Sequence, residues 1–189
     1  VDAQDGNKLL TIDATDPRVL RLPWELLADK SGHLFSRRIN IRRRLQEEVT
    51  APSREFALPV RILVVVSRPE DAGYIDARNV SRPLLDALEK LGDQIVAEFL
   101  YPPTLNVLSK RLDDEDAPPV HVVHFDGHGK YDGKAGLGFL LFEDETHKSD
   151  PVDAKKLGNL LNRRGVPLMV LNACQSAAQD ETNPYTSVA

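Results

Sequence analysis

Two residues of this chain could form a catalytic pair: a cysteine and a histidine that each follow a short apolar run. Cys174 is the single cysteine, and it comes shortly after the run at residues 166–171. His128 lies between two glycines, shortly after the run at residues 120–125. A nearby imidazole can take the thiol proton, and the resulting thiolate is a strong nucleophile. We therefore predict that Cys174 is a nucleophile and His128 its base, which is the chemistry of a cysteine peptidase.

Strands and helices alternate along the chain, and this alternation would place both residues at one edge of a sheet. Apolar runs predict strands at residues 60–66, 95–101, 120–125, 137–142 and 166–171. Leucines at helical spacing predict helices that begin at the capping residues Ser81, Thr104 and Asp153. The pattern is typical of a mostly parallel sheet with helices on its faces. Sites in such sheets lie outside the carboxyl ends of the strands, where residues from neighbouring strands can meet.

The N-terminal region has a different organisation. Residues 8–14 and 34–41 have the pattern of strands, and residues 22–27 that of a short helix between them. Pro23 suits the first turn of this helix, and we expect Trp24 to pack in the core.

The whole chain, residues 1–189, is expected to form one domain. Residues 1–57 would be an N-terminal subregion ending in a polar connection at 46–57, and residues 58–189 the catalytic core. Few residues follow the cysteine, and the last six have the pattern of a helix that begins. We therefore expect the fold to be cut before its last strands, and the chain alone to have weak or no activity.

Further residues near the pair carry groups that a hydrolase could use. Gly129 would let the backbone approach a substrate closely. Its N–H and that of Cys174 could together form an oxyanion hole. Asp126 could orient His128 or line a substrate pocket, or it could merely form a turn.

Other interpretations of these residues give different chemistry or none. A lone cysteine after a strand is more often inert packing than a nucleophile, although histidine between two glycines has little packing rationale. Ser176 is a rival nucleophile. His121, His124 and His128 look like a metal cluster, but strand alternation turns the first two to opposite faces. We expect these two to be hydrogen-bonded locally, and we expect neither a metal nor a cofactor.

Composition limits the class of protein. The 189 residues are 41% hydrophobic and 28% charged, as is ordinary for a soluble globular protein. The net charge of −5 argues against direct nucleic-acid binding, and we interpret the five arginines between residues 37 and 44 as a solvated strand or hairpin face. A single cysteine fits a reducing compartment, so we expect the cytoplasm. No apolar run approaches the roughly 20 residues that span a bilayer, so no membrane partner is expected.

Three segments together resemble the CHAT domain family, which consists of caspase-like cysteine peptidases often attached to helical TPR repeats. Residues 124–129, His-Phe-Asp-Gly-His-Gly, are similar to the family's histidine motif. Residues 171–176, Leu-Asn-Ala-Cys-Gln-Ser, are similar to its cysteine motif. Residues 22–27, Leu-Pro-Trp-Glu-Leu-Leu, followed by a basic strand, are similar to its N-terminal signature. Order and spacing agree across nearly the whole chain.

The resemblance implies a caspase-like three-layer sandwich, with a mostly parallel central sheet flanked by helices. It implies peptide hydrolysis through a thioester, with Cys174 as nucleophile, His128 as base and the N–H groups of Gly129 and Cys174 as the oxyanion hole. In the wider caspase-like group, the residue two before the cysteine helps line the pocket for the substrate residue that precedes the cut. That residue is Asn172 here, and a neutral side chain leaves the preference open.

The resemblance also implies partners and leaves alternatives. The partners would be a protein or peptide substrate and a helical-repeat region or regulator that holds the enzyme in check. The main alternative is a catalytically weak or inactive caspase-like module that acts through protein interaction. A further alternative is an esterase that uses Ser176.

Overall fold

The computed structural model describes residues 8–20, 22–34, 39–45, 57–76, 78–132 and 137–173. They belong to two compact units, the first containing the described residues up to 45 and the second those from 57 onward. The predicted connection at 46–57 is described only at its last residue, and the predicted helix start near the end of the chain lies outside the described ranges. The assignment of the whole chain to one domain stays a prediction.

The first unit contains a small parallel sheet. Strand β1 (Lys8–Ala14) pairs over its full length with β4 (Ile39–Leu45). The elements between them are short: α1 (Pro17–Leu20), the 3₁₀ helix η1 (Trp24–Leu26), and the antiparallel strands β2 (Ala28–Asp29) and β3 (Gly32–His33).

Most of the predicted elements of this unit are present. The strand at 8–14 is confirmed, and the helix at 22–27 is confirmed as a single 3₁₀ turn. The predicted strand at 34–41 is wrong at its start, because Leu34 lies in a bend and β4 begins at Ile39. Trp24 is partly buried, and its indole Nε1 donates to Val19 O at 2.7 Å.

Arg43, one of the arginines interpreted as a solvated strand or hairpin face, is an exposed residue of β4 and also makes structural contacts. Its guanidinium donates to Leu20 O at 2.7 Å and Leu22 O at 3.0 Å, and it forms an ion pair with Glu25. These contacts hold the segment from α1 to η1 against β4. Arg43 is therefore a structural residue of the first unit.

The second unit is built on a mixed six-stranded sheet in its described part. The strand order is β6-β5-β7-β8-β9, and β10 also pairs with β7. The strands are β5 (Val60–Val66), β6 (Ile95–Phe99), β7 (Val122–Asp132), β8 (Leu137–Glu143), β9 (Ser149–Asp153) and β10 (Leu168–Ala173). The helices are α2 (Arg78–Leu91), α3 (Leu105–Asp113) and α4 (Ala154–Arg163).

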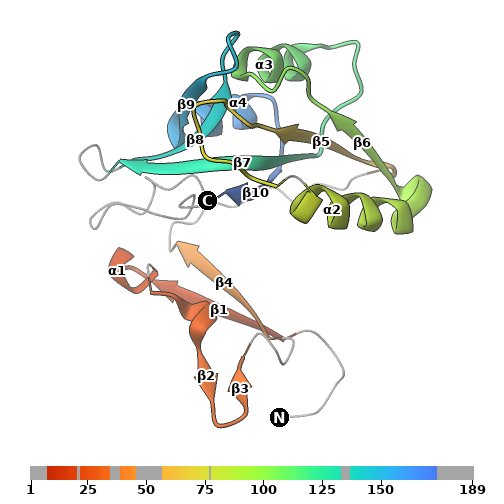
Figure 1. The fold of residues 1–189 in the computed structure, drawn as a ribbon. Coiled ribbons are helices and arrows are strands. Elements are labelled where there is room, and N and C mark those ends of the chain that lie inside the picture. Colours follow the sequence, from red (N-terminus) through yellow and green to blue (C-terminus); the bar gives the residue numbers. More distant parts are fainter. Residues whose placement is uncertain are drawn as a thin grey trace. The chain divides into compact units, whose positions relative to one another are not determined.

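The layers agree with the predicted α/β class. Strands β6, β5, β7 and β10 pair in parallel, whereas β8 and β9 are antiparallel to their neighbours. Figure 1 shows α3 and α4 on one side of this sheet and α2 on the other. The mostly parallel sheet with flanking helices is therefore confirmed, and it is consistent with a caspase-like fold. In the described ranges, no helix is long and apolar enough to cross a bilayer.

The core lies between the sheet and helices α3 and α4. Leu63, Val65, Val123 and Phe125 are fully buried in it, and the rings of Phe125 and Phe142 lie 5.0 Å apart. Since side chains alternate along a strand, the residues between these turn to the opposite face. That face carries the predicted site.

The helix starts were predicted correctly in two of three cases. Thr104 Oγ1 accepts from Val107 N at 3.1 Å, and Asp153 Oδ1 accepts from Lys156 N at 2.8 Å, so both caps are confirmed. The predicted cap at Ser81 is wrong, because α2 already begins at Arg78.

Candidate active site

Strand β7 changes partners where the predicted site begins. It pairs in parallel with β5 as far as Asp126 and with β10 as far as Gly127, and it then pairs antiparallel with β8 from His128 onward. The prediction that the strand ends at 125 and that His128 follows it is therefore wrong. His128 lies within β7, but at the level where the neighbouring parallel strands β5 and β10 end.

Gly127 lies inside β7, at a point where the packing leaves no room for a Cβ atom. A Cβ atom at this position would lie 2.8 Å from Phe125 Cε1 and 3.1 Å from Ser67 O. The glycine is required by close packing of the strand against its surroundings, and β8 takes up the pairing beyond it. The turn expected from the Gly-His-Gly sequence is therefore absent from the described residues of β7.

The register of β10 brings two predicted site residues together. Asn172 lies opposite Asp126, and Ala173 lies opposite Gly127. The two strands that lead to His128 and Cys174 in the sequence, β7 and β10, are thus neighbours in the sheet. Cys174, the next residue in the sequence, lies outside the described residues, as does Ser176.

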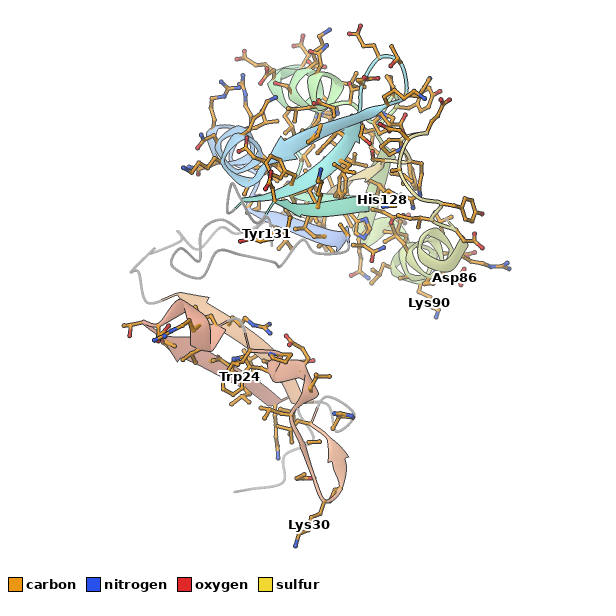
Figure 2. The ribbon with its side chains drawn as sticks, turned by 60° about the vertical axis from the view of Figure 1, so that its left-hand side comes forward. Trp24, Lys30, Asp86, Lys90, His128 and Tyr131 are labelled. Atoms are coloured by element: carbon orange, nitrogen blue, oxygen red, sulfur yellow. The ribbon has the colours of Figure 1, made fainter. Side chains whose placement is uncertain are left out.

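The imidazole of His128 contacts a backbone carbonyl. Its Nε2 lies 2.6 Å from Gly73 O, in the loop that follows β5. A carbonyl oxygen only accepts hydrogen bonds, so Nε2 carries the proton and the neutral ring keeps Nδ1 as an acceptor. Figure 2 shows His128 on β7, with Tyr131 farther along the same strand. The contact orients the imidazole and fixes its tautomer.

The loop that provides this carbonyl is anchored on the turn between β8 and β9. Asp71 Oδ1 accepts from both N and Oγ of Ser149 at 2.8 Å, and Lys148 Nζ binds Glu70 Oε2 at 2.9 Å. The bonds from Ser149 lower the pKa of Asp71, and the bond from Lys148 lowers the pKa of Glu70. Both carboxylates therefore hold the loop in their charged form.

Glu143, a buried residue at the end of β8, adds a second anchor. Its Oε1 accepts from Arg68 N at 2.9 Å, and its Oε2 lies 2.9 Å from His147 Nδ1. The hydrogen bond to Glu143 raises the pKa of His147. The segment from residue 68 to Gly73 is thus tied to the antiparallel part of the sheet before it reaches His128.

Asp126 is 2% exposed, and its carboxylate bridges the loop after β5 to β10. Its Oδ2 pairs with Arg68 Nη2 at 2.6 Å, and its Oδ1 accepts from Asn172 Nδ2 at 3.0 Å. The interpretation as a turn former is wrong, because Asp126 lies in β7. In the described part of the chain its carboxylate contacts these two residues and not His128.

The other histidines near the site differ in their contacts. His121 precedes β7, and its Nδ1 accepts from Arg61 N at 3.1 Å, as expected for a locally bonded side chain. His124 lies in β7, and its buried Nδ1 has no hydrogen-bond partner among the described residues, so local hydrogen bonding is not confirmed at that nitrogen. Burial lowers the pKa of His124. Within the described ranges, no three His, Cys, Asp or Glu residues lie close enough to hold a metal.

A cavity of about 530 Å³ lies elsewhere in this unit, between α3 and α4. Its lining contains none of the predicted site residues, so this cavity is not the predicted active site. The lining residues are Leu105, Asn106, Ser109, Asp150, Lys156, Asn159, Leu160 and Arg163.

Sequence reasoning missed Arg68 and Gly73. Both lie in the loop after β5, and their contacts with Asp126 and His128 join positions more than fifty residues apart. The only sequence signal for them is that loops at the carboxyl ends of parallel strands carry sites. That signal indicates that the loop after β5 contributes to the site, but it does not indicate which residues of the loop do so.

Comparison with known protein families identifies a family that covers nearly the whole chain. The family model described as the CHAT domain matches residues 1–188, and the match therefore spans both compact units. No curated protein matches the chain.

Proposed function

Since this chain belongs to the CHAT domain family, we propose that it is a caspase-like cysteine endopeptidase that hydrolyses peptide bonds of specific protein substrates through Cys174 and His128. The observation that carries the proposal is the register of β10. Ala173 lies opposite Gly127, and the two proposed catalytic residues are the next residues in the sequence, Cys174 after Ala173 and His128 after Gly127. Paired strands lie about 4.8 Å apart, so residues that follow a register pair are within reach of each other.

The contact with Gly73 supports a defined role for each nitrogen of His128. Because Nε2 donates to Gly73 O, Nδ1 is left to take the proton from the thiol of Cys174. The thiolate attacks the substrate carbonyl, and the protonated imidazole gives its proton to the leaving amine as the thioester forms. Water then hydrolyses the thioester and regenerates the thiol. Throughout, the carbonyl of Gly73 faces the positive charge that develops on the ring.

The direction of the backbone groups supports Gly129 as an oxyanion donor. Asp126 O accepts from Ser67 N, so the backbone groups of Asp126 turn toward β5. Successive residues of a strand turn their backbone groups to alternate sides, so those of His128 turn the same way and those of Gly129 turn toward the side of β10. The N–H of Gly129 is then directed to the side where Cys174 follows β10, as an oxyanion hole made with the N–H of Cys174 needs.

The surroundings of the dyad are also part of the proposal. Asn172 lines the substrate pocket, the buried carboxylate of Asp126 holds its amide, and the substrate is a protein or peptide. The regulatory partner is a helical-repeat region, and the protein acts in the cytoplasm, where a single thiol stays reduced.

The experiment that tests the dyad is the pH dependence of alkylation of Cys174, followed by intact-mass spectrometry. Because the chain has one cysteine, each added mass reports this thiol alone. We expect an apparent pKa well below the free-thiol value of about 8.5, and its loss in His128→Ala. His33→Ala, which replaces an exposed histidine of β3, is the matched control and should keep the low value.

An ordinary thiol pKa that is indifferent to His128 would contradict the dyad and favour the non-catalytic interaction module. Peptide cleavage gives an independent measure. Cys174→Ala should abolish cleavage, whereas Ser176→Ala should leave it intact. The reverse result would favour the esterase alternative.

A further inference from the structure

We propose that the groove between α3 and α4 is a docking site for an acidic peptide segment of a protein partner, in which carboxylates flank an apolar side chain. The groove is the cavity of about 530 Å³ described above, and its lining contains neither His128 nor the strand that leads to Cys174. A partner bound there would use a surface separate from the candidate active site, so the proposal does not depend on the peptidase assignment.

One face of α4 forms a wall of this groove. Its groove residues recur every three or four positions and therefore lie on the same side of the helix: Lys156, Asn159, Leu160 and Arg163. The two basic residues are about two turns apart, roughly 10 Å along the helix axis. Leu160 is 8% exposed, whereas the other three are exposed. The face thus has an apolar floor between two cationic ends.

The positive charge of this face is available to a ligand. Within the described part of the chain, neither the Lys156 ammonium nor the Arg163 guanidinium forms an ion pair, whereas the next residue, Arg164, pairs with Asp113. All charged residues of α4 are basic, although the net charge of the whole chain is −5. Such a local positive potential attracts carboxylates.

The remaining groups of the groove favour a peptide over other anions. Asp150, a half-buried residue of β9, only accepts hydrogen bonds when ionised, so it suits the N–H groups of a peptide backbone and repels a chain of phosphates. The amides of Asn106 and Asn159 both donate and accept, as pairing with peptide groups requires. Leu105 and Leu160 provide apolar contact for the side chain between the two carboxylates.

The test is fluorescence anisotropy of the whole chain with a short fluorescein-labelled peptide in which glutamates flank a pair of leucines. One control peptide has glutamine in place of glutamate, and the other has serine in place of leucine. We expect each control to bind at least about tenfold more weakly. The first loses the attraction of both cations, and the second loses the apolar contact.

Variants of the groove show whether the peptide binds there. Lys156→Glu and Arg163→Glu should each weaken binding of the glutamate peptide at least about fivefold, because a like charge replaces an opposite one. Lys155→Glu is the matched control, since it changes the net charge equally at a neighbouring residue outside the groove, and it should keep the affinity within about twofold. Asn106→Trp fills the groove without changing the charge and should weaken binding at least about tenfold. All four positions are exposed, so the core stays intact.

The outcomes separate this inference from the proposed function. Absence of binding, equal effects of Lys155→Glu and Lys156→Glu, or unchanged binding in Asn106→Trp would overturn the docking site. Tighter binding of a single-stranded oligonucleotide than of the glutamate peptide would overturn the choice of a peptide partner. Cys174→Ala should bind the peptide as the wild type does, and loss of binding in that variant would mean that the peptide occupies the candidate active site instead. Conversely, an ordinary thiol pKa in the alkylation experiment would contradict the peptidase function and leave the docking site in place.

Discussion

At the scale of single residues, two glycines of the second unit have opposite surroundings. A Cβ at Gly127 would clash with the Phe125 ring and approach Ser67 O, whereas a Cβ at Gly158, within α4, meets nothing within 4 Å. We expect Gly127→Ala to lower the free energy of unfolding by about 1–3 kcal/mol, since the strand must shift. Gly158→Ala should raise it by about 0.5–1 kcal/mol, because alanine has the higher helix propensity. Urea denaturation of both variants measures the difference, and equal effects would contradict the packing at Gly127.

His147 should make stability depend on pH near neutrality. The hydrogen bond to Glu143 raises the folded-state pKa of His147 above its ordinary value of about 6.5. Protonated His147 is therefore stabilised in the folded state, so its contribution is complete below about pH 6.5 and is lost as pH rises through the raised pKa. The melting temperature should fall over this interval, and the fall should be smaller in His147→Gln. Proton NMR titration of the His147 ring checks the direction of the shift.

His124 should change the pH dependence of stability in the opposite direction. Burial lowers its folded-state pKa, so the unfolded chain binds a proton more readily than the folded one. The stability linked to His124 is therefore present above about pH 6.5 and is lost as pH falls through the ordinary pKa toward the lowered one. Replacement by asparagine, which does not titrate there, should flatten the acid side of the melting-temperature profile. A steeper decline in that variant would contradict the sign.

The sequence predicted some residues of the candidate site and missed others for a physical reason. Asp126, His128 and Asn172 stand near apolar runs whose direction and spacing can be read locally, and the register places two of them opposite each other. Arg68 and Gly73 act through contacts across the sheet, with partners more than fifty residues away. No local pattern encodes such a contact. The catalytic role of the Cys174 thiol stays a prediction.

At the scale of elements, side-chain caps fix where helices α3 and α4 begin. Thr104 is 7% exposed and its Oγ1 binds Val107 N. We expect Thr104→Ala to cost about 1 kcal/mol of unfolding free energy, because a first-turn N–H loses its partner, whereas Thr104→Ser should keep most of the stability. Chemical denaturation compares the two, and equal losses would show that the methyl group rather than the hydroxyl matters.

The elements that sequence reasoning misjudged are those defined by their neighbours. The length of β7 depends on β8 taking over the pairing at His128, so the glycines that read as a turn lie inside the strand. Strand β9 went unpredicted because its sequence, Ser-Asp-Pro-Val-Asp, is polar and contains a proline, and it pairs only at the edge beside β8. Apolar runs and caps that act within a few residues were found correctly, as at β5 and α4.

At the scale of the whole molecule, the two compact units differ in how much apolar surface they bury. The core formed by β5, β7 and the helices α3 and α4 contains side chains with no exposure, such as Leu63 and Phe125. In the described part of the first unit, Leu20 is the buried hydrophobic residue, and β1 and β4 have only each other as partners. A two-stranded sheet is marginal without further packing, so the units should differ in local stability.

This difference predicts the pattern of amide hydrogen exchange. Amides bonded between strands at Leu63, Val65 and Phe125 should exchange only through global opening of the second unit and be the slowest of the chain. Amides bonded between β1 and β4 should exchange at least about tenfold faster, because their opening exposes little apolar surface. Exchange followed by mass spectrometry of peptic fragments tests this, with the variant Gly127→Ala as an internal control. That substitution should speed exchange in β5 and β7 and leave β1 and β4 unchanged if the units open separately. Equal protection of both sheets, or acceleration of both by the one substitution, would show instead that the chain opens as one cooperative body.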